Sequence, residues 1–390
     1  MKIFIVGTGA VGSVLINALA KFKEFDPIYC VTNDKKQAEM SIKPNRRVKL
    51  FIADINDTKK VEKLAKGSSL IINAASPWLN IKIMKLALKA GANYQDLESY
   101  LGCDDGVSKT PYKIEHLALE KEFKRKNLCA LFDAGVAPGL TNLVVAHAAD
   151  KGKLKTARIR FIEDTQSSVA FSTWSPAATM DELQSRPIIY ENGKFVLLER
   201  FSREENFKFP VPFGKKITYP IMNNESFTIP HYLKLKNIDV RSSGSDMEVA
   251  KMMVGMGLLG MKPISINGTN VSPMDLLIKI LPPTPTPAEI KDLIKKGLLK
   301  DGFFEISIET IASNGKIKKY WMPFPSQKEL IKRNINSTYI AYPTGICAAA
   351  FALEMHNIKK SGVFPPEGMP KINRANVLKN MKRLGLKINI

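Results

Sequence analysis

The chain has 390 residues, of which 45% are hydrophobic and 24% are charged, and these proportions exclude a disordered or fibrous protein. This length suits two domains better than one core. No run of about 18 apolar residues is present, so we predict no membrane partner. The first strand leads into a glycine motif without a signal-like segment, so we expect a cytoplasmic protein.

The net charge is strongly positive: 58 Lys and Arg residues against 37 Asp and Glu residues give +21. Such a charge can serve nucleic-acid binding or attract small anions. The lysines are spread along the chain, without a basic block interleaved with aromatic residues, so we expect an anionic cofactor or substrate and no nucleic acid. The cysteines are too far apart to predict a metal site or a disulfide framework: Cys30, Cys103, Cys129 and Cys347.

Short apolar strands alternate with amphipathic helices through the first 135 residues. The pattern predicts strands at 2–6, 26–31, 46–54, 68–75, 93–99 and 128–135. It predicts helices at 13–22, 35–43, 57–67, 77–92 and 114–127. This alternation is typical of a parallel sheet that helices cover on both faces.

The later part of the chain is richer in strands and turns. "LPPTPTP" at 281–287 predicts a stiff connector before a helix. Residues 301–324 predict a hairpin that turns at Asn314-Gly315. A helix rich in small residues at 343–355 can pack closely on a sheet, so we expect the chain to return there to its first domain.

The "GTGAVG" motif at 7–12 has the context of a dinucleotide-binding loop, because it follows a strand and opens a helix. Gly7 permits the tight turn, Gly9 admits a pyrophosphate and Gly12 allows close helix packing, while the helix N-terminus adds positive potential. Predicted cofactor contacts here are Gly7, Gly9, Ala10, Val11 and Gly12. The predicted fold class is α/β: a Rossmann doubly wound parallel sheet from 1–135 plus about 340–375, with an inserted α+β substrate and dimerisation domain at about 136–339.

The ends of the next three strands offer further cofactor contacts. Thr32, Asn33 and the lysines that follow suit a 2′-phosphate, which favours NADP. A small shift of the strand end would bring Asp34 to the ribose and favour NAD instead. Asp54 can accept from the adenine amino group, or it is a helix cap or a loop acid. Small residues after the fourth strand let a cofactor lie close: Ala74, Ala75, Ser76 and Pro77.

Five motifs together resemble the saccharopine dehydrogenase-like family: "GTGAVG", "NAASPWL", "DAGVAPGLTN", "TWSPAATMDE" and "SGVFPPEGM". The resemblance spans nearly the whole chain. It implies a Rossmann domain with an inserted substrate domain, and NAD(P)-dependent oxidation of an amine to an imine. The family includes saccharopine, lysine and carboxynorspermidine dehydrogenases. Saccharopine-forming members carry an acid where this chain has Ala137, so this loop looks closer to lysine-dehydrogenase-type members.

The loop after the sixth strand, "LFDAGVAPGLTN" (131–142), is predicted to face the nicotinamide and the substrate. Gly135 and Gly139 permit close backbone approach, and the amides that begin the next helix at Leu140 can hold a substrate carboxylate. Asp133 can bind an ammonium group or accept backbone N–H groups of the loop. Predicted substrate contacts are Gly135, Val136, Ala137, Pro138, Gly139 and Asn142.

Other candidate substrate contacts lie in the second domain. Trp174 and Ser175 match the substrate-domain motif of the resemblance, although an indole can equally pack in a core. Arg186 and Arg241 can bind carboxylates bidentately or form surface ion pairs.

Amine oxidation needs the reacting carbon aligned with the nicotinamide and a deprotonated amine. The candidates for proton handling are Asp96, Asp133 and Tyr100. We interpret His116 and His147 as structural, since both lie within helical patterns. The sequence therefore predicts an NAD(P)-dependent oxidoreductase, dimeric through its second domain, that acts on a C–N bond of an amino acid or opine-like substrate. The alternative is a non-catalytic dinucleotide-binding regulatory or assembly protein.

Overall fold

The computed structural model describes residues 1–100, 103–104, 107–108 and 114–390. The chain forms two compact units. The first comprises Met1–Leu101, Lys113–Asp150 and Ala341–Ile388, and the second comprises Gly102–Tyr112, Lys151–Ile340 and Asn389–Ile390. Among the described residues, no helix has both the length and the apolar character that a membrane span requires.

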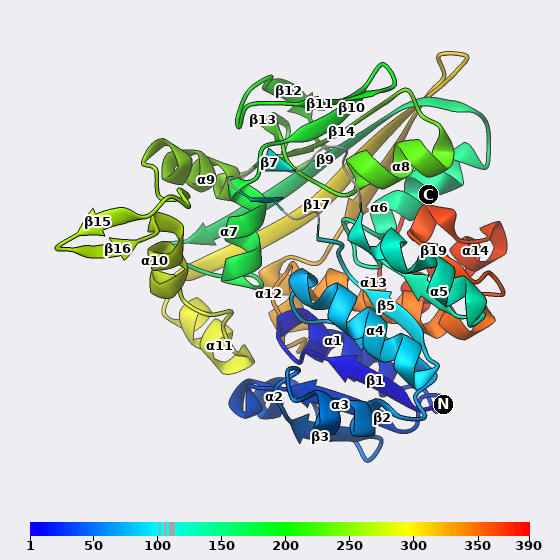
Figure 1. Cartoon of the computed structure of the whole chain (residues 1–390). Helices are drawn as coiled ribbons and strands as arrows, with labels where there is room; N and C mark the ends of the chain where they lie inside the picture. Colours follow the sequence, from blue (N-terminus) through cyan, green and yellow to red (C-terminus); the bar gives the residue numbers. More distant parts are fainter. Residues whose placement is uncertain (101–102, 105–106, 109–113) are drawn as a thin grey trace. The chain divides into compact units, whose positions relative to one another are not determined.

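The first unit contains a parallel sheet of the strands β1 (Ile3–Val6), β2 (Ile28–Thr32), β3 (Val48–Ile52), β4 (Leu70–Asn73), β5 (Asn93–Asp96), β8 (Cys129–Leu131) and β19 (Gly362–Phe364). Its helices are α1 (Ala10–Leu19), α2 (Lys35–Ser41), α3 (Thr58–Ala65), α4 (Asn80–Ala90), α5 (Glu120–Arg125), α6 (Leu140–Ala149), α13 (Ala341–Glu354) and α14 (Lys371–Arg383), with the 3₁₀ turns η1 (Pro77–Leu79), η2 (Glu115–Leu119), η3 (Met355–Asn357) and η4 (Pro366–Gly368). The strand order is β19-β8-β5-β4-β1-β2-β3, and Figure 1 labels β1, β2, β3, β5 and β19 of this sheet. The order reverses between β1 and β4, as it does in a Rossmann sheet. The predicted fold class of this unit is therefore confirmed.

Local sequence accounts for most of these elements. The strands β1 and β4 are short apolar runs buried along their whole length, as expected where helices cover both faces. Carboxylates cap two helices: Asp34 accepts from the amide at the start of α2, and Asp57 does so for α3. The helix predicted at 114–127 begins instead as the 3₁₀ turn η2 and continues as α5.

The chain returns to the first unit in α13, as the small residues of that helix predicted. A Cβ added at Gly345 would lie 2.6 Å from the Val14 side chain of α1, so the two helices are in close contact. The carbonyl of Ala348 accepts a hydrogen bond of 2.9 Å from Gln95 in β5. This unit extends past the boundaries expected at 135 and 375, because α6 packs against η4 and α14.

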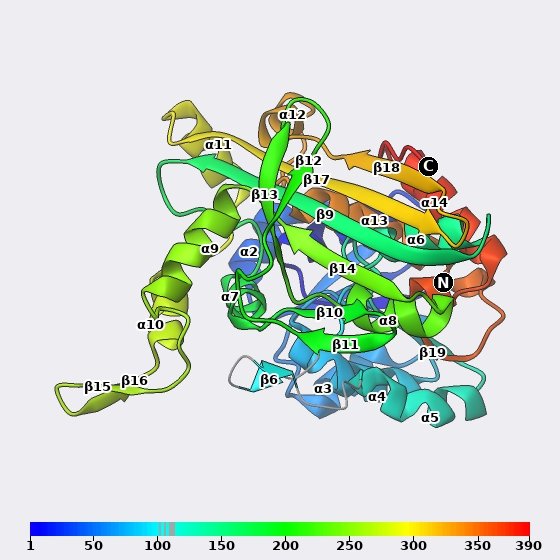
Figure 2. The same ribbon diagram turned by 90° about the horizontal axis from the view of Figure 1, so that it is seen from above.

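The second unit contains β6 (Cys103–Asp104), β7 (Val107–Ser108), β9 (Leu154–Ser167), β10 (Ile188–Glu191), β11 (Lys194–Leu197), β12 (Glu205–Lys208), β13 (Lys215–Pro220), β14 (Asn237–Ser242), β15 (Ile264–Ile266), β16 (Thr269–Val271), β17 (Leu299–Ala312) and β18 (Ile317–Pro323). Its helices are α7 (Pro176–Gln184), α8 (Glu225–Leu233), α9 (Ser245–Gly255), α10 (Pro273–Ile280), α11 (Pro287–Lys295) and α12 (Gln327–Lys332). The strand order of the main sheet is β11-β10-β14-β9-β17-β18. The pair of β14 with β9 is parallel, and the other strand pairs of this sheet are antiparallel. Figure 2 shows the long strands β9 and β17 side by side. The predicted hairpin is confirmed, with Gly315 at φ +83° in its turn.

Candidate functional site

The three glycines of the 7–12 loop have different surroundings. A Cβ at Gly7 would lie 2.6 Å from the backbone of Ala74, and one at Gly12 would lie 2.4 Å from the carbonyl of Gly7. A Cβ at Gly9 would meet no heavy atom of the described residues within 4 Å. Gly7 and Gly12 therefore serve the fold of the loop itself, whereas Gly9 faces open space.

The start of α1 is suited to an anion. Its first turn holds no acidic residue, and within the described part of the chain no side chain caps it. The first amides of a helix have no acceptor inside the helix and carry positive potential. The buried hydroxyl of Thr8 also lacks a hydrogen-bond partner among the described residues. This loop therefore has both the donors and the space that a pyrophosphate requires.

The ends of β2 and β3 carry acids with local partners. The hydroxyl of Thr32 accepts from the Asp34 N–H at 3.1 Å, and the Asp34 carboxylate accepts from the Gln37 N–H at 2.9 Å. Asn33 is exposed beside them. Asp54 accepts from the Asn56 N–H at 2.7 Å, so it forms a loop turn after β3. Asp34 thus caps α2 through one carboxylate oxygen and is itself exposed.

The segment after β4 lies against the glycine loop. The Ala74 N–H donates to the carbonyl of Val6 at 2.8 Å, which extends the pairing of β4 with β1. The Ala75 N–H donates to the Asn73 side chain at 3.0 Å, and η1 begins at Pro77 immediately after Ser76. Gly7 and these residues flank the point where the strand order reverses, which is where such sheets bind nucleotides.

A buried polar cluster joins the carboxyl ends of β5 and β8. The Asp96 carboxylate lies 2.6 Å from His116 Nε2 and accepts from the Asp133 N–H at 3.0 Å. The Asp133 carboxylate accepts from the Ser99 N–H at 2.6 Å. The exposed fractions of Asp96, His116 and Asp133 are 1%, 0% and 0%. The structure therefore brings two predicted acids together with a histidine that the sequence suggested was structural.

The charges in this cluster compensate one another. Burial and the neighbouring Asp96 carboxylate raise the pKa of Asp133 to about 7. Burial lowers the pKa of His116, but the charge and hydrogen bond of Asp96 outweigh it, so that this pKa is raised overall. Both pKa values are therefore raised by groups within this one cluster, among which Asp96 acts on His116 and on Asp133. Asp133 also has φ +60°, a conformation uncommon for residues other than glycine.

The two glycines of the 131–142 loop let two segments of its own backbone lie in close contact. A Cβ at Gly139 would lie 2.0 Å from the carbonyl of Gly135. The Gly135 N–H donates to the carbonyl of Pro138 at 3.0 Å, and the Leu140 N–H donates to the carbonyl of Gly135 at 3.1 Å. The Leu140 N–H, one of the amides predicted to hold a substrate carboxylate, is therefore already bonded within the loop.

Asn142 has a structural position in the same loop. Its side-chain oxygen accepts from the Gly139 N–H at 2.8 Å, and its amide nitrogen donates to buried Glu367 at 3.0 Å. These contacts hold the loop, and the assignment of Asn142 to the substrate stays a prediction. Val136 is buried, and Ala137 is partly exposed. Sequence reasoning missed Glu367, although it lies in "SGVFPPEGM", one of the motifs that carried the resemblance.

Tyr100 occupies a more open position than the two acids. It is partly exposed, and its ring meets that of Trp78 edge-on, with centroids 6.4 Å apart. Trp78 is 47% exposed and follows β4, while Tyr100 follows β5. These rings therefore lie beyond the same edge of the sheet as the glycine loop.

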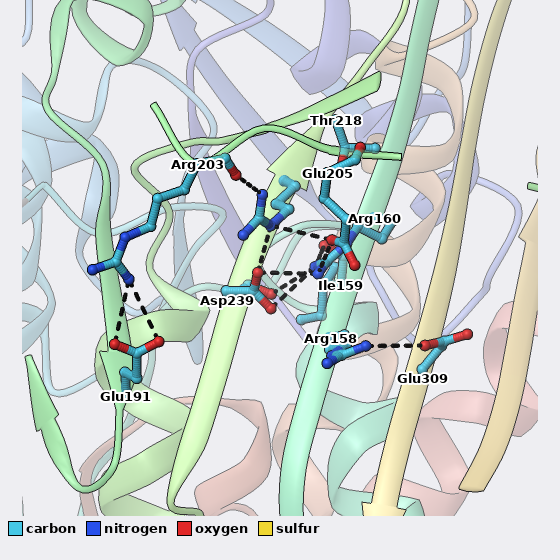
Figure 3. A network of polar contacts seen from close by, with 10 residues as sticks. Arg158, Ile159, Arg160, Glu191, Arg203, Glu205, Thr218, Asp239 and Glu309 are labelled. Atoms are coloured by element: carbon cyan, nitrogen blue, oxygen red, sulfur yellow. Dashed lines mark hydrogen bonds and ion pairs between the residues drawn. The ribbon is translucent and has the colours of Figure 1, made fainter. Parts of the chain in front are cut away.

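In the second unit, a buried ion network engages one of the predicted arginines. Figure 3 shows the guanidinium of Arg160 between the carboxylates of Glu205 and Asp239, at 2.7 and 3.0 Å. Arg241 lies 2.6 Å from Asp239 and also donates to the carbonyl of Arg203. Burial acts to raise the pKa of Asp239, but the two guanidiniums lower it overall. Arg241 therefore has an ion-pair partner within its own unit, and its assignment to a substrate carboxylate stays a prediction.

The other predicted residues of this unit also have local contacts. Arg186 pairs with the exposed Glu199, which is the surface ion pair that the sequence left open as an alternative, and its contact with substrate stays a prediction. Ser175 caps α7 by accepting from an amide of its first turn. Trp174 is partly buried, and its carbonyl accepts from the Thr284 hydroxyl at 2.6 Å.

Comparison with known families places both parts of the chain in one group. Residues 3–131 match the saccharopine dehydrogenase NADP binding domain, and residues 135–386 match the saccharopine dehydrogenase C-terminal domain. Carboxynorspermidine synthase of Vibrio cholerae is 25% identical, over 99% of this chain and 96% of the relative. Carboxyaminopropylagmatine dehydrogenase of Synechocystis is 24% identical, over 94% of this chain and 92% of the relative.

Solved structures share the fold at lower identity. Saccharopine dehydrogenase (L-Glu forming) from Saccharomyces cerevisiae has a TM-score of 0.67 at 16% identity, covering 100% of this chain and 98% of that one. Homospermidine synthase from Legionella pneumophila, in complex with NAD, has a TM-score of 0.68 at 12% identity, covering 100% and 90%. The likeness extends over both units.

Proposed function

Since the chain belongs to the saccharopine dehydrogenase family and is an NAD(P)-dependent oxidoreductase of a carbon–nitrogen bond, we propose that its substrate is a carboxylated polyamine. One observation carries the proposal: two relatives named for carboxylated polyamine compounds match 99% and 94% of the chain. Family membership also favours an enzyme over the regulatory alternative. A dinucleotide supplies the hydride acceptor or donor when it is bound.

The reaction interconverts a secondary amine and the imine that links the same two chains, and water added to the C=N bond then separates them into a carbonyl compound and an amine. In the oxidative direction, the C–H bond of the substrate breaks and its electron pair leaves as hydride. The nitrogen loses its proton, and a C=N bond forms between the carboxyl-bearing carbon chain and the amine. In the reductive direction, the imine takes up hydride at carbon and a proton at nitrogen.

The residues of the glycine loop are suited to hold the cofactor. The first-turn amides of α1 bind the pyrophosphate, in the space beside Gly9. Asn33 and the neighbouring lysines would hold a 2′-phosphate, since amide and ammonium groups donate to phosphate oxygens, while one oxygen of Asp34 caps α2. We therefore assign NADP as the preferred cofactor.

The buried acids position a loop and do not touch the substrate. Asp133 holds the Ser99 N–H, and the Asn80 side chain holds the carbonyl of Glu98 at 2.8 Å. Together they fix the backbone that leads to Tyr100. Among the three proton-handling candidates, Tyr100 is the partly exposed one, and we assign proton transfer with substrate to its hydroxyl.

The test is turnover on a panel of amines with NADP⁺ and with NAD⁺, read at the nicotinamide absorbance band. The panel holds carboxynorspermidine, saccharopine and lysine. We expect kcat/KM for the carboxylated polyamine to exceed that for lysine by at least about tenfold, since tenfold requires only about 1.4 kcal/mol of selective binding. Turnover of lysine or saccharopine in preference to carboxynorspermidine contradicts the proposal. Lysine is included because Ala137 made the loop resemble that of lysine-dehydrogenase-type members.

A further inference from the structure

One carboxylate of the second unit lies beside an aromatic patch on the main sheet. Directly opposed residues of antiparallel strands share a face, so Glu163 of β9 lies on the same face as Phe304 of β17. Phe161 and Thr165, two positions before and after Glu163, lie on that face as well. The rings of Phe161 and Phe304 meet edge-on, with centroids 6.2 Å apart. Glu163 is therefore an acid at the border of an apolar surface.

The Glu163 carboxylate has no partner of its own. It is partly exposed, and it makes no hydrogen bond or ion pair with a residue that the structure describes. Glu305 of β17, by contrast, accepts from the Trp321 indole at 2.6 Å. A largely desolvated carboxylate is stable as an anion only where a cation or several donors compensate it. Glu163 is therefore a position at which a bound ligand can supply the missing positive charge.

The acid that interacts with Glu163 is itself fully engaged. Asp246 of α9 accepts from the Thr165 N–H at 3.2 Å, from its hydroxyl at 3.1 Å and from the Ser245 hydroxyl at 3.1 Å. The Tyr339 hydroxyl lies 2.6 Å from that of Thr165 and extends this network. Burial and the charge of Asp246 raise the pKa of Glu163 to about 8. Glu163 is thus mostly protonated at neutral pH until a cation binds beside it.

A second oxygen without a partner lies on the same face. Arg241 of β14 pairs with Arg160 of β9, and both guanidiniums lie on the side of the buried ion network. The next residue of each strand, Ser242 and Phe161, faces the other side, which is the side of Glu163. Ser242 is 3% exposed, and its hydroxyl has no hydrogen-bond partner among the described residues. Buried hydroxyls are ordinarily bonded, so this one also indicates a missing ligand group.

The backbone holds Ser242 and Glu163 near each other. The Glu163 N–H donates to the carbonyl of Ser243 at 2.9 Å. A Cβ at Gly244 would lie 2.0 Å from the Glu163 carbonyl, so only glycine permits this approach of the two strands. Regular strand spacing places the Cα atoms of Ser242 and Glu163 about 8 Å apart. An ammonium group has three N–H donors and is therefore suited to bond both side chains at once.

We propose that Glu163 and Ser242 form the site that recognises a primary ammonium group of the substrate, with both side-chain oxygens accepting its N–H donors. The inference rests on the proposed function, because a carboxylated polyamine carries such ammonium groups, and it assigns the residues that select them. Phe161 and Phe304 then border the methylene chain of the amine. A carboxylate in the place of the ammonium would meet an acid and no cation, so the site selects against substrates that end in a second carboxylate there.

Isothermal titration calorimetry with norspermidine in the presence of NADP⁺ tests this assignment. Norspermidine has ammonium groups and no carboxylate, so its affinity is measured apart from turnover. We expect Glu163→Gln to raise its Kd about tenfold or more, because a charge-assisted hydrogen bond is lost. Glu305→Gln is the matched control, since burial also raises the pKa of this acid, to about 7, while it lies on the opposite face and is held by Trp321. We expect E305Q to bind norspermidine as the wild type does.

The same titration at pH 7, in two buffers of different ionisation enthalpy, adds a readout that a structural role would not change. Glu163 has to lose its proton when an ammonium group binds, because its pKa without the ligand is about 8. We therefore expect the wild type and E305Q to release about one proton more per bound norspermidine than E163Q does.

Equal affinity of E163Q and the wild type overturns the assignment, as does equal proton release, or a wild type that does not bind norspermidine. A wild type that binds norspermidine through Glu163 but turns over lysine in preference to carboxynorspermidine contradicts the proposed substrate and supports the amine site. Circular dichroism melting checks that E163Q folds. Should it not fold, Ser242→Ala, which removes only the unpartnered hydroxyl, carries the same expectation of weaker norspermidine binding.

Discussion

At the scale of single residues, the three glycines of the 7–12 loop have different physical roles. Gly7 and Gly12 are required because a Cβ would collide with backbone, whereas Gly9 borders open space. The backbone at Gly9, with φ −65° and ψ −163°, is one that other residues also adopt. Substitution at these positions therefore separates folding from cofactor binding.

Gly9→Val is expected to leave the fold intact and to abolish NADPH binding, because the added side chain fills the space that the pyrophosphate needs. Fluorescence titration with NADPH measures the affinity, which we expect to fall about a hundredfold or more, equal to about 2.7 kcal/mol. Gly12→Ala is the comparison variant, which we expect to affect folding. Its Cβ would lie 2.4 Å from the Gly7 carbonyl, so we expect a lower melting temperature. Tight NADPH binding by G9V would show that the cofactor lies elsewhere.

Asp133→Asn is expected to change how stability depends on pH. The pKa of Asp133 is raised from 3.8 in the unfolded chain to about 7 in the fold, so the native state binds more protons between these values. The stability from the neutral carboxyl is complete below about pH 4 and is lost as the pH rises to about 7. Asparagine imitates the neutral form, keeps an acceptor for the Ser99 N–H and tolerates positive φ.

Thermal unfolding at pH 5 and pH 8 tests this prediction. We expect D133N to gain stability relative to the wild type at the higher pH, by on the order of 2–4 kcal/mol. His116 adds a pH dependence of the same sign, which is smaller in D133N because the Asp133 charge helps to raise the pKa of His116. Asp54→Asn, at an exposed loop acid, is the control. Parallel pH profiles for the wild type and D133N would mean that Asp133 is charged throughout this range.

At the scale of elements, β9 carries two arginines that point to different environments. Arg160 is 1% exposed and makes two buried ion pairs, whereas Arg158 is 44% exposed and lies 3.9 Å from Glu309. Removing one member of a buried network leaves carboxylates without compensation, while an exposed pair contributes little. Strand alternation places residues 158 and 160 on the same face of β9, so it does not predict which of the two guanidiniums is buried.

Arg160→Leu is expected to destabilise the second unit by about 3–5 kcal/mol, because Glu205 and Asp239 lose their buried partner. Arg160→Lys should restore only part of this, since an ammonium cannot bind two carboxylates as a planar fork does. Arg158→Leu is the matched control and should cost at most about 1 kcal/mol. Denaturant unfolding followed by circular dichroism measures all three, and equal effects at both positions would contradict the assigned role of the network.

At the scale of the whole molecule, the charge of +21 governs the approach of ligands. We expect the association rate constant of NADPH, an anion, to fall as salt is added, because the attraction is screened. A carboxylated polyamine has net positive charge, so its association should be unchanged or faster in salt. Stopped-flow fluorescence measures the first rate and kcat/KM at low substrate measures the second. An equal decrease for both ligands would show that net charge does not steer them.

The sequence alone was sufficient to predict the structural features that depend on residues close together in the chain. Apolar runs and amphipathic periods predicted the strand–helix alternation, and the strand that precedes Gly7 predicted the nucleotide loop. The turn at Asn314-Gly315 followed from the same kind of local signal. These features rest on backbone conformation and short-range periodicity, which a stretch of sequence contains in full.

Only the tertiary structure decided the contacts between distant residues. Asp96, His116 and Asp133 form one cluster because two strands and a turn bring them together, and no spacing in the sequence indicates it. The same holds for Asn142 with Glu367, which are 225 residues apart. A side chain's function depends on which partners already occupy its hydrogen-bonding groups, and packing of the whole chain selects those partners.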